Sequence, residues 1–495
     1  MAQCYHSPAM ETRRAFLAHT LGASVTLALT AAREQSALAA QAVDAGAVQR
    51  LRVSLKGRLI MSGDATYDTA RRIFWAHSGV DKRPSMIAQC AAPDDVARCV
   101  EFGRRHELSM AVRGGGHSFL GMGTCDDGLV IDLSPLNGIS IDPARRTARA
   151  GAGVRAQELV HAAGRYALAP VLGECPGVGV AGLTLGGGVG WLSAKYGATC
   201  DNLISANLVT TDSRTIPASA TSNPDLFWAI RGGGGNFGIA TSLEYRLHPV
   251  PDVLAGGFSY RLRDARAVLR FYRDFMATAP DELQGLATLT PADGGTINVI
   301  VVYVGDTGAG QRVLSPLRSI ATVTRDTVER RTYADTLTMP PYGEVVPTSF
   351  FAVRGAYLAT LSDEAIEAAL SCYAQAPAGC TIGFDHYMHG AVCRVAPDAT
   401  AFELRAPGAV HVWIAPGWNA ASQESAYMNW TNETGQQLQA TFSGGRVYSN
   451  YQSAEGDAVT RSIFGVNHAR LVAVKQKYDP ANVLNRNANI RPSVP

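Results

Sequence analysis

The sequence predicts an α+β fold in two parts, with the second part inserted into the first. Residues from about Ser62 to Val250 alternate short strand patterns with helical ones and carry three glycine-rich runs. From Pro251 these runs stop, and longer helix and strand patterns begin. An amphipathic pattern over 465–477 indicates a helix that returns to the first part.

Hydrophobic periodicity places the elements of the first part. It predicts helices at 44–55, 94–105, 155–163 and 224–229, and strands at 108–112, 129–133, 147–150 and 203–210. Val96, Cys99 and Val100 share one face of the helix at 94–105. Asn223-Pro224 has the residue types preferred at an N-cap and a first helical position.

The inserted part has fewer signals. The patterns predict a helix at 264–278, a strand at 297–304, and helices near Gln311 and Glu364. In the final helix, Val466, Leu471 and Val474 form the expected apolar face.

Composition favours a large folded core and argues against a nucleic-acid partner. The 495 residues are 46% apolar and 17% charged, which is typical of a globular chain. The formal net charge is +2, and Lys and Arg are scattered along the chain, without a basic stripe that could follow a phosphate backbone.

The N-terminus has the pattern of an export signal of the twin-arginine type. Thr12-Arg13-Arg14-Ala15-Phe16-Leu17 precedes an apolar stretch ending near Ala32, and Ala37-Leu38-Ala39 suits cleavage before Ala40. We therefore expect residues 1–39 to be a signal peptide and the protein to be periplasmic or secreted, with no stable membrane span after cleavage. A membrane anchor and a disordered tail are the alternatives, and Met10 is an alternative start.

The nine cysteines suggest neither a zinc site nor a small disulfide scaffold, because no CxxC pair is present. Cys372 and Cys380 could pair in an oxidising compartment, which the sequence alone does not decide.

The three glycine runs indicate a large phosphate-bearing cofactor, because glycine lets backbone N–H groups approach an anion. The runs cover 113–118, 173–190 and 231–238. A Rossmann site is disfavoured because the first run lacks a following helical pattern, and no run continues as a P-loop.

Three motifs in this order resemble the FAD-linked oxidases of the vanillyl-alcohol-oxidase/PCMH superfamily, and within it the berberine-bridge-enzyme-like group. They are R-G-G-G-H-S with His117, G-x-C-P-x-V-G with Cys175, and Tyr448-Ser449-Asn450-Tyr451. The resemblance implies an FAD-binding domain of PCMH type at 40–250 (core 83–250), a substrate-binding domain at 251–443, and a C-terminal segment at 444–495 that completes the FAD domain. The inserted antiparallel sheet, covered by helices, would form the roof of the active site.

The resemblance further implies a bicovalent FAD, with His117 bonded to the flavin 8α-methyl group and Cys175 to C6. A histidine between glycines can reach a planar ring, and a thiol in an N–H-rich turn becomes a nucleophile if its pKa falls. The alternatives are a loop histidine that hydrogen-bonds a backbone carbonyl and a small buried cysteine.

Further residues are predicted at the cofactor. They are Arg113, Gly114, Gly115, Gly116, Ser118, Gly177, Val178, Gly179, Gly182, Gly187, Gly190, Ile239, Asn485 and Asn487. Asp132 and Arg231 are weaker candidates, since each is more often an ordinary strand or loop residue.

Tyr448 matches the tyrosine that relatives use as the catalytic base, and Tyr451 is a second phenol that could assist it. An unperturbed phenol with a pKa near 10 is a poor base at neutral pH, so the role requires a lowered pKa. Both tyrosines could instead only pack on a strand. Val189 replaces a tyrosine of some plant relatives, which weakens the case for a paired-tyrosine mechanism there.

The resemblance implies an oxidase that removes hydride from an alcohol, sugar or natural product and returns the electrons to O2 as H2O2. Val178, three positions after Cys175, matches a valine that accompanies oxidase activity in relatives. The alternatives are a flavin dehydrogenase, an oxidative cyclase of secondary metabolism, and a non-catalytic exported flavin- or ligand-binding protein. The expected partners are O2 and a small-molecule substrate, for which a sugar or secondary alcohol is favoured. The expected oligomeric state is a monomer or a weak homodimer.

Overall fold

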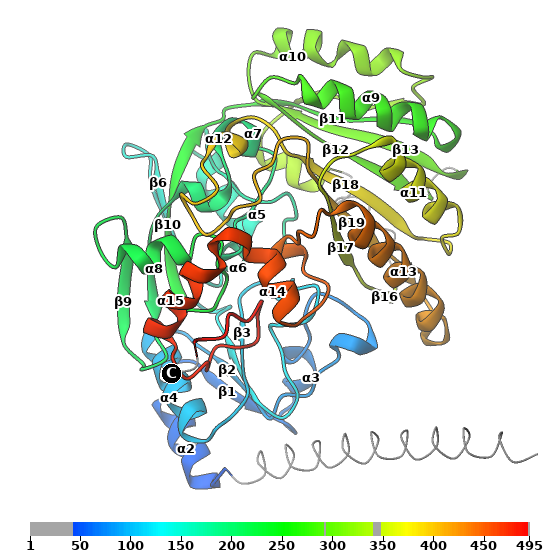
Figure 1. Cartoon of the computed structure of the whole chain (residues 1–495). Coiled ribbons are helices and arrows are strands. Elements are labelled where there is room, and N and C mark those ends of the chain that lie inside the picture. Colours follow the sequence, from blue (N-terminus) through cyan, green and yellow to red (C-terminus); the bar gives the residue numbers. More distant parts are fainter. Residues whose placement is uncertain (1–42, 292–293, 340–347, 494–495) are drawn as a thin grey trace, which may run out of the picture.

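The computed structural model describes residues 43–291, 294–339 and 348–493, and Figure 1 shows their arrangement. The predicted signal peptide, residues 1–39, lies outside these ranges. Within them, the strands form three main sheets and alternate with helices along the chain, which confirms the α+β prediction. No helix in the described ranges is both long and apolar enough to cross a membrane.

The first sheet has the strand order β1-β2-β4-β3. Its strands are β1 (Arg58–Met61), β2 (Met86–Gln89), β3 (Met110–Arg113) and β4 (Leu129–Asp132). β4 pairs in parallel with β2 and β3, and β1 is antiparallel to β2. Helix α4 (Pro93–Arg105) connects β2 to β3 and buries Val96, Cys99 and Val100, as predicted.

The second sheet is antiparallel, with the order β5-β6-β10-β8-β9 and β7 paired to β10. Its strands are β5 (Ile139–Asp142), β6 (Thr147–Gly151), β7 (Leu168–Pro170), β8 (Leu203–Val209), β9 (Thr215–Ser219) and β10 (Ile239–Pro249). The helices of the first part are α2 (Ala45–Ser54), α3 (Tyr67–Ala70), α5 (Ala156–Gly164), α6 (Val180–Leu185), α7 (Ser193–Tyr196) and α8 (Pro224–Ala229).

The predicted cap of α8 is correct in position but wrong in mechanism. Asn223 is the N-cap residue, in the left-handed region with φ 49°, and its side chain makes no capping hydrogen bond. Its amide donates instead to the carbonyl of Pro217, at 2.7 Å, because the tight turn after β9 directs the side chain there.

The third sheet forms most of the inserted part and has the order β14-β11-β13-β12-β18-β19-β17, with β15 paired to β11. Its strands are β11 (Val253–Arg261), β12 (Leu283–Thr290), β13 (Thr296–Tyr303), β14 (Arg325–Asp326), β15 (Glu329–Arg331), β17 (Arg354–Leu358), β18 (Thr381–Tyr387) and β19 (Val410–Ala415). Helices α9 (Ala265–Ala277), α10 (Thr307–Leu314), α11 (Asp363–Ala374) and α13 (Glu424–Phe442) lie on its outer side in Figure 1.

Strand periodicity gives the third sheet two different faces. Along β13, Ile297, Val299 and Val301 are buried in the core under the helices, whereas Asn298 and Ile300 point to the opposite side. That opposite face is the roof of the cavity described below.

Five further elements complete the described chain. They are α12 (Ala391–Arg394), the small β16 (Phe350–Phe351) and β20 (Gly417–Trp418) pair, α14 (Asp457–Phe464) and α15 (His468–Tyr478). Helix α15 packs on α8 of the first part. Leu471 and Val474 are buried as predicted, but Val466 is 76% exposed. The α-helix begins only at His468, so Val466 lies in a preceding 3-10 turn and off the apolar stripe.

Cys372 and Cys380, which could pair in an oxidising compartment, form no disulfide in the structure. Both thiols are buried and free, Cys372 on α11 and Cys380 just before β18. The Cys372 thiol instead lies 3.4 Å from the side-chain oxygen of Gln437.

Candidate active site

A cavity of about 1820 Å³ lies between the glycine-rich loops of the first part and the inner face of the third sheet. All three glycine runs reach it. The predicted residues that line it are Arg113, Gly114, Gly115, Gly116, His117, Ser118, Cys175, Gly177, Val178, Gly179, Gly182, Ile239, Tyr448, Tyr451 and Asn487. Residues far apart in the sequence therefore line one cavity.

Three predicted cofactor residues lie outside the lining. Gly187 and Gly190 serve packing, because an added Cβ would lie 2.5 Å from the Phe402 ring and 1.9 Å from the Leu172 carbonyl oxygen, respectively. Asn485 is exposed, and its amide donates to the carbonyl of Asn482, at 3.1 Å.

The two weaker candidates also lie outside the lining. The Asp132 carboxylate accepts a hydrogen bond from the Arg113 guanidinium at 3.0 Å, so it orients a residue of the lining without reaching the cavity. Arg231 packs over the Phe227 ring at 4.4 Å and donates to a backbone carbonyl of that residue.

His117 is held in place by aromatic neighbours at the edge of the cavity. Its imidazole stacks on the Phe74 ring with a centroid distance of 4.0 Å, and the Trp75 indole donates to its backbone carbonyl at 3.1 Å. Burial, assisted by the positive charge of Arg155, lowers the pKa of His117 to about 4. The imidazole is therefore neutral at physiological pH and keeps one nitrogen lone pair available.

The pKa of the Cys175 thiol does not fall in the chain alone. Burial raises its pKa to about 11, and the charge of Glu174 adds to this. The backbone N–H groups of Gly177 and Val178 lower the pKa, as expected for an N–H-rich turn, but burial outweighs them. In the chain alone the thiol is thus protonated at neutral pH.

Gly177 connects the two side chains. Its N–H group contacts the Cys175 thiol, and a Cβ on Gly177 would lie 2.9 Å from His117 Nε2. The first and second glycine runs also touch directly, because a Cβ on Gly115 would lie 2.2 Å from the backbone nitrogen of Gly179. Only glycine at these positions lets the loops that carry His117 and Cys175 meet.

Tyr448 is almost completely enclosed. Its side chain is 3% exposed, stacks on the His411 ring at 4.2 Å, and receives a hydrogen bond from the Asn450 amide at 3.0 Å. Burial raises the pKa of the Tyr448 phenol, although the Asn450 contact opposes the shift. A base role requires the opposite shift, so the chain alone does not prepare Tyr448 for it.

Tyr451 has a more open setting and a charged partner. Its ring stacks on Phe119 with a centroid distance of 5.1 Å, and its hydroxyl donates to the carboxylate of Asp385 on β18. Asp385 and its neighbour His411 were not predicted from the sequence, because neither belongs to a motif: Asp385 stands in the mixed strand sequence TIGFDHY, and His411 is a single polar residue in the apolar strand VHVWIA.

The roof of the cavity carries a ladder of uncharged polar side chains, and three arginines of the same sheet, Arg261, Arg325 and Arg331, also line the cavity. Asn298 of β13 donates to the hydroxyl oxygens of Thr288, Thr290 and Thr296 at 3.2–3.3 Å and accepts from Ser259 at 2.7 Å. All five line the cavity. Trp413 of β19 also lines it, with its indole across Gly383, where an added Cβ would lie 2.1 Å from the ring.

Comparison with known proteins identifies the family. A family described as "FAD binding domain" matches residues 84–219, and one described as "Berberine and berberine like" matches 426–491. (R)-6-hydroxynicotine oxidase of Paenarthrobacter nicotinovorans is 31% identical over 463 residues, covering 89% of this chain and 98% of the relative. The chain belongs to the berberine-bridge-enzyme-like FAD-linked oxidases.

Solved structures agree with this assignment. The crystal structure of 6-hydroxy-D-nicotine oxidase from Arthrobacter nicotinovorans is 28% identical, covers 89% of this chain and 99% of its own, and has a TM-score of 0.81. Berberine bridge enzyme from Eschscholzia californica is 20% identical, covers 91% and 99%, and also has a TM-score of 0.81, a likeness that concerns the fold alone.

The cavity of this FAD-linked oxidase fits its cofactor. Arg486 Nε and Asn487 Oδ1 are buried and have no hydrogen-bond partner in the part of the chain that the structure describes, and both residues line the cavity. A buried polar atom without a partner is costly, and FAD carries both donors and acceptors that can satisfy such atoms. Arg486 was missed from the sequence, although it directly precedes the predicted Asn487.

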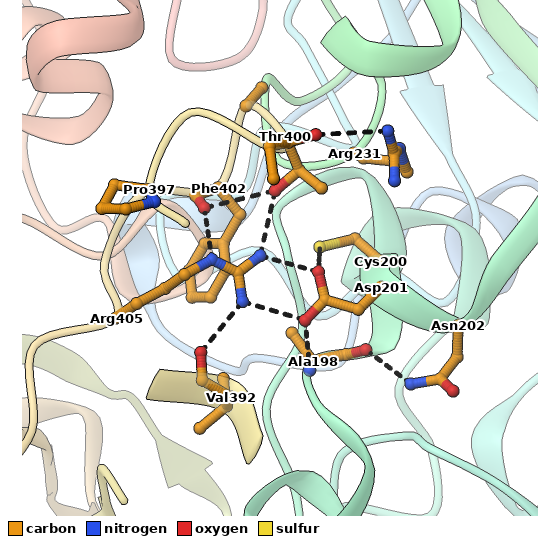
Figure 2. A network of polar contacts seen from close by, with 12 residues as sticks. Ala198, Cys200, Asp201, Asn202, Arg231, Val392, Pro397, Thr400, Phe402 and Arg405 are labelled. Atoms are coloured by element: carbon orange, nitrogen blue, oxygen red, sulfur yellow. Dashed lines mark hydrogen bonds and ion pairs between the residues drawn. The ribbon is translucent and has the colours of Figure 1, made fainter. Parts of the chain in front are cut away.

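A buried network fastens the oxidase's loop 392–405 to the first part, and Figure 2 shows its contacts. Arg405 donates to both carboxylate oxygens of Asp201, at 2.9 and 2.7 Å, and to the carbonyls of Phe402 and Val392. Phe402 lies 5.9 Å from the Tyr448 ring, measured between centroids. The network therefore fixes the packing beside Tyr448.

Proposed function

We propose that the protein oxidises the CH–OH group of a small hydroxylated substrate and transfers the electrons to O2, producing H2O2. The observation that carries this proposal is the convergence of the three glycine runs, His117 and Cys175 on one cavity that the third sheet also lines. Bound FAD would supply the hydride acceptor at N5, and the chain would hold the substrate and take up its proton.

We further propose that His117 and Cys175 both bond FAD covalently. The neutral imidazole and the Gly177 contact that links the two side chains support a joint attachment site. Purified protein should stay yellow after acid denaturation, and tryptic fragments containing His117 and Cys175 should carry flavin mass. Cys175→Ala should leave a singly attached flavin with a changed absorption spectrum. An unchanged spectrum, or no flavin adduct on either fragment, would exclude the double attachment.

The two phenols, Tyr448 and Tyr451, are our candidates for contact with the substrate hydroxyl, with Tyr448 as the predicted base. Both line the cavity, and their ring centroids are 5.3 Å apart. Tyr448→Phe should slow flavin reduction at saturating substrate by about 10²-fold or more if that phenol takes the proton.

The roof favours a substrate with several hydroxyl groups. The ladder of Ser259, Asn298 and three threonines offers uncharged donors and acceptors, and Trp413 offers an apolar ring face. A sugar or secondary alcohol fits this lining. A hydroxylated N-heterocycle is the second candidate, because the relative at 31% identity is named for 6-hydroxynicotine.

A substrate panel tests the function. Sugars, secondary alcohols and 6-hydroxynicotine would be assayed for H2O2 release in air and for loss of flavin absorbance without air. Bleaching without peroxide on re-aeration would indicate a dehydrogenase, and a new carbon–carbon bond in the product would indicate a cyclase. Absence of both bleaching and product with every compound would support a binding protein.

We also propose export by the twin-arginine route, supported by the motif at Thr12–Leu17 and the alanine-rich cleavage sequence. Replacing Arg13 and Arg14 together by Lys should retain the precursor inside the cell. Cell fractionation with a flavin-fluorescence gel would show its position.

A further inference from the structure

One register row crosses the inner face of the third sheet, from the edge strand β14 to β19. From strand to strand, its members are Arg325, Ser259, Asn298, Thr288, Gly383 and Trp413. The next row begins with Arg261, which lies opposite Thr296. All of these residues except Gly383 line the cavity. The lining therefore changes along the sheet from two arginines, through a ladder of hydroxyl and amide groups, to an aromatic ring.

The carboxylates of this sheet leave the Arg261 charge to a ligand. Asp326 lies opposite Phe258, which is in the core under the helices, and its carboxylate accepts from Arg318 at 2.8 Å. The third lining arginine, Arg331, already contacts Glu329 at 2.9 Å. Among the described residues, no hydrogen bond or ion pair occupies the Arg261 guanidinium.

The rest of the lining does not supply a counter-charge at this end either. Glu174 is the only carboxylate among the lining residues that the structure describes, and it belongs to the second glycine run. The arginine end of the cavity is thus suited to an anionic group and not to a cationic one.

Sheet spacing separates the arginines from the two cavity phenols. The Tyr451 hydroxyl contacts Asp385 of β18. In the strand order, β11 with Arg261 is three strands from β18, and β14 with Arg325 is four. At about 4.8 Å per strand, these separations are roughly 14 and 19 Å. An extended arginine side chain covers part of this length, and the remainder is longer than a single sugar ring.

The polar groups between the two ends can still bind a ligand. Asn298 donates to Thr288 Oγ1, so the hydroxyl hydrogen of Thr288 is not used in that contact. The Nε1–H group of Trp413 is buried and has no hydrogen-bond partner among the described residues. Hydroxyl groups along the middle of a substrate would satisfy both donors.

We propose that Arg261 and Arg325 form a distal subsite for a carboxylate, so that the substrate is an elongated hydroxylated acid whose carbinol end lies at Tyr448 and Tyr451. A guanidinium presents N–H donors in a planar fork that matches a carboxylate, and hydrogen bonds between opposite charges are stronger than neutral ones. This assignment rests on the proposed function and adds a charge requirement to it. Oxidation takes place at one end of the substrate, and the acid is recognised at the other.

The test uses two compounds that differ only in charge: a trisaccharide with a single uronic acid at its non-reducing end, and the methyl ester of the same trisaccharide. We expect kcat/KM for the acid to exceed that for the ester by about 10-fold or more, mainly through a lower KM. The KM for the acid should rise with ionic strength, whereas that for the ester should not. Equal kcat/KM values for acid and ester would overturn the proposal.

Substitutions then assign the preference to the two arginines. Arg261→Gln and Arg325→Gln each remove the charge and keep a polar side chain, and each should lower the acid-to-ester ratio of kcat/KM; the double variant should bring it close to one. Arg263→Gln is the matched control, because Arg263 is exposed in the turn after β11 and lies outside the lining. It should keep the wild-type ratio. An unchanged ratio in the double variant would overturn the assignment.

A binding measurement separates this subsite from the proposed function. The acid and the ester, each with its reducing end blocked as a methyl glycoside, would be titrated into the purified flavoprotein by calorimetry. The acid should bind about 10-fold more tightly than the ester to wild type and to Arg263→Gln, and the difference should disappear in the double variant. Equal Kd values in wild type would overturn the subsite. If the acid binds with this preference but neither unblocked compound reduces the flavin, the proposed function fails and the subsite stands.

Discussion

Removing the guanidinium of Arg405 should destabilise the protein strongly. The Arg405 and Asp201 side chains are 2% and 11% exposed, and Arg405 makes both of its ion-pair contacts at 2.7–2.9 Å. In Arg405→Met the Asp201 carboxylate would keep the backbone N–H of Ala198, at 2.8 Å, but lose its positive partner. Breaking a buried pair from one side typically costs about 3–5 kcal/mol, because the remaining charge is buried without compensation.

Urea unfolding followed by tryptophan fluorescence would measure this cost. The midpoint should fall, and the slope should stay the same if only stability changes. The control is Arg394→Met, because Arg394 is 61% exposed in its pair with Asp281 and exposed pairs contribute little. In the double variant Asp201→Asn/Arg405→Met the cost should be smaller than the sum of the single costs, since no buried charge remains.

The reasoning would be refuted if Arg405→Met and Arg394→Met had equal midpoints. It would also be refuted if the costs of Asp201→Asn and Arg405→Met simply added. Either result would mean that the contacts shown in Figure 2 do not form a coupled buried pair.

Three further predictions follow from the cavity wall. Gly115→Ala should abolish FAD incorporation, because the added Cβ would collide with the Gly179 backbone. Gly164→Ala is the control, because a Cβ there meets nothing within 4 Å, and this variant should bind FAD normally. The ratio of flavin absorbance to protein absorbance measures both. The flavin-free chain should lose stability as pH falls from about 6.5 through 4. The reason is that His117 is protonated at its ordinary pKa in the unfolded chain, whereas in the folded chain its pKa is lowered to about 4. His117→Gln should make that loss smaller in acid titrations of urea midpoints, and an unchanged pH dependence would contradict the sign. Val178→Ile, which adds a methyl group to the cavity lining, should slow reoxidation by O2 in stopped-flow absorbance without slowing flavin reduction; equal reoxidation rates would remove Val178 from the oxygen path.

Several parts of the fold could be predicted because their signals are local. The helix at Pro93–Arg105 buries Val96, Cys99 and Val100 as its 3.6-residue period requires. The positions of α8, α9 and β13 likewise follow from apolar periodicity and from residues that favour helix starts. Val466 was misplaced because an amphipathic pattern continues through a 3-10 turn whose geometry differs from that of an α-helix.

Within the candidate site, the three glycine-rich runs could be recognised from the sequence, but the role of each glycine could not. Gly115 and Gly187 look alike in sequence, yet the first lets two loops meet at the cavity and the second makes room for Phe402. The direction of the Cys175 pKa shift could not be predicted, since the N–H groups of its turn are visible in the motif and the burial of the thiol is not.

The amino-acid sequence by itself determined the fold class, the cofactor type and the three motifs, because periodicity and glycine-rich runs are patterns of neighbouring residues that can be recognised without knowing which segments pack together. The tertiary structure alone decided which side chains meet. Asp385 and Tyr451 are 66 residues apart, and Asp201 and Arg405 are 204 apart. Such pairs leave no periodic signal, since they form only when separate strands and loops pack around a common cavity.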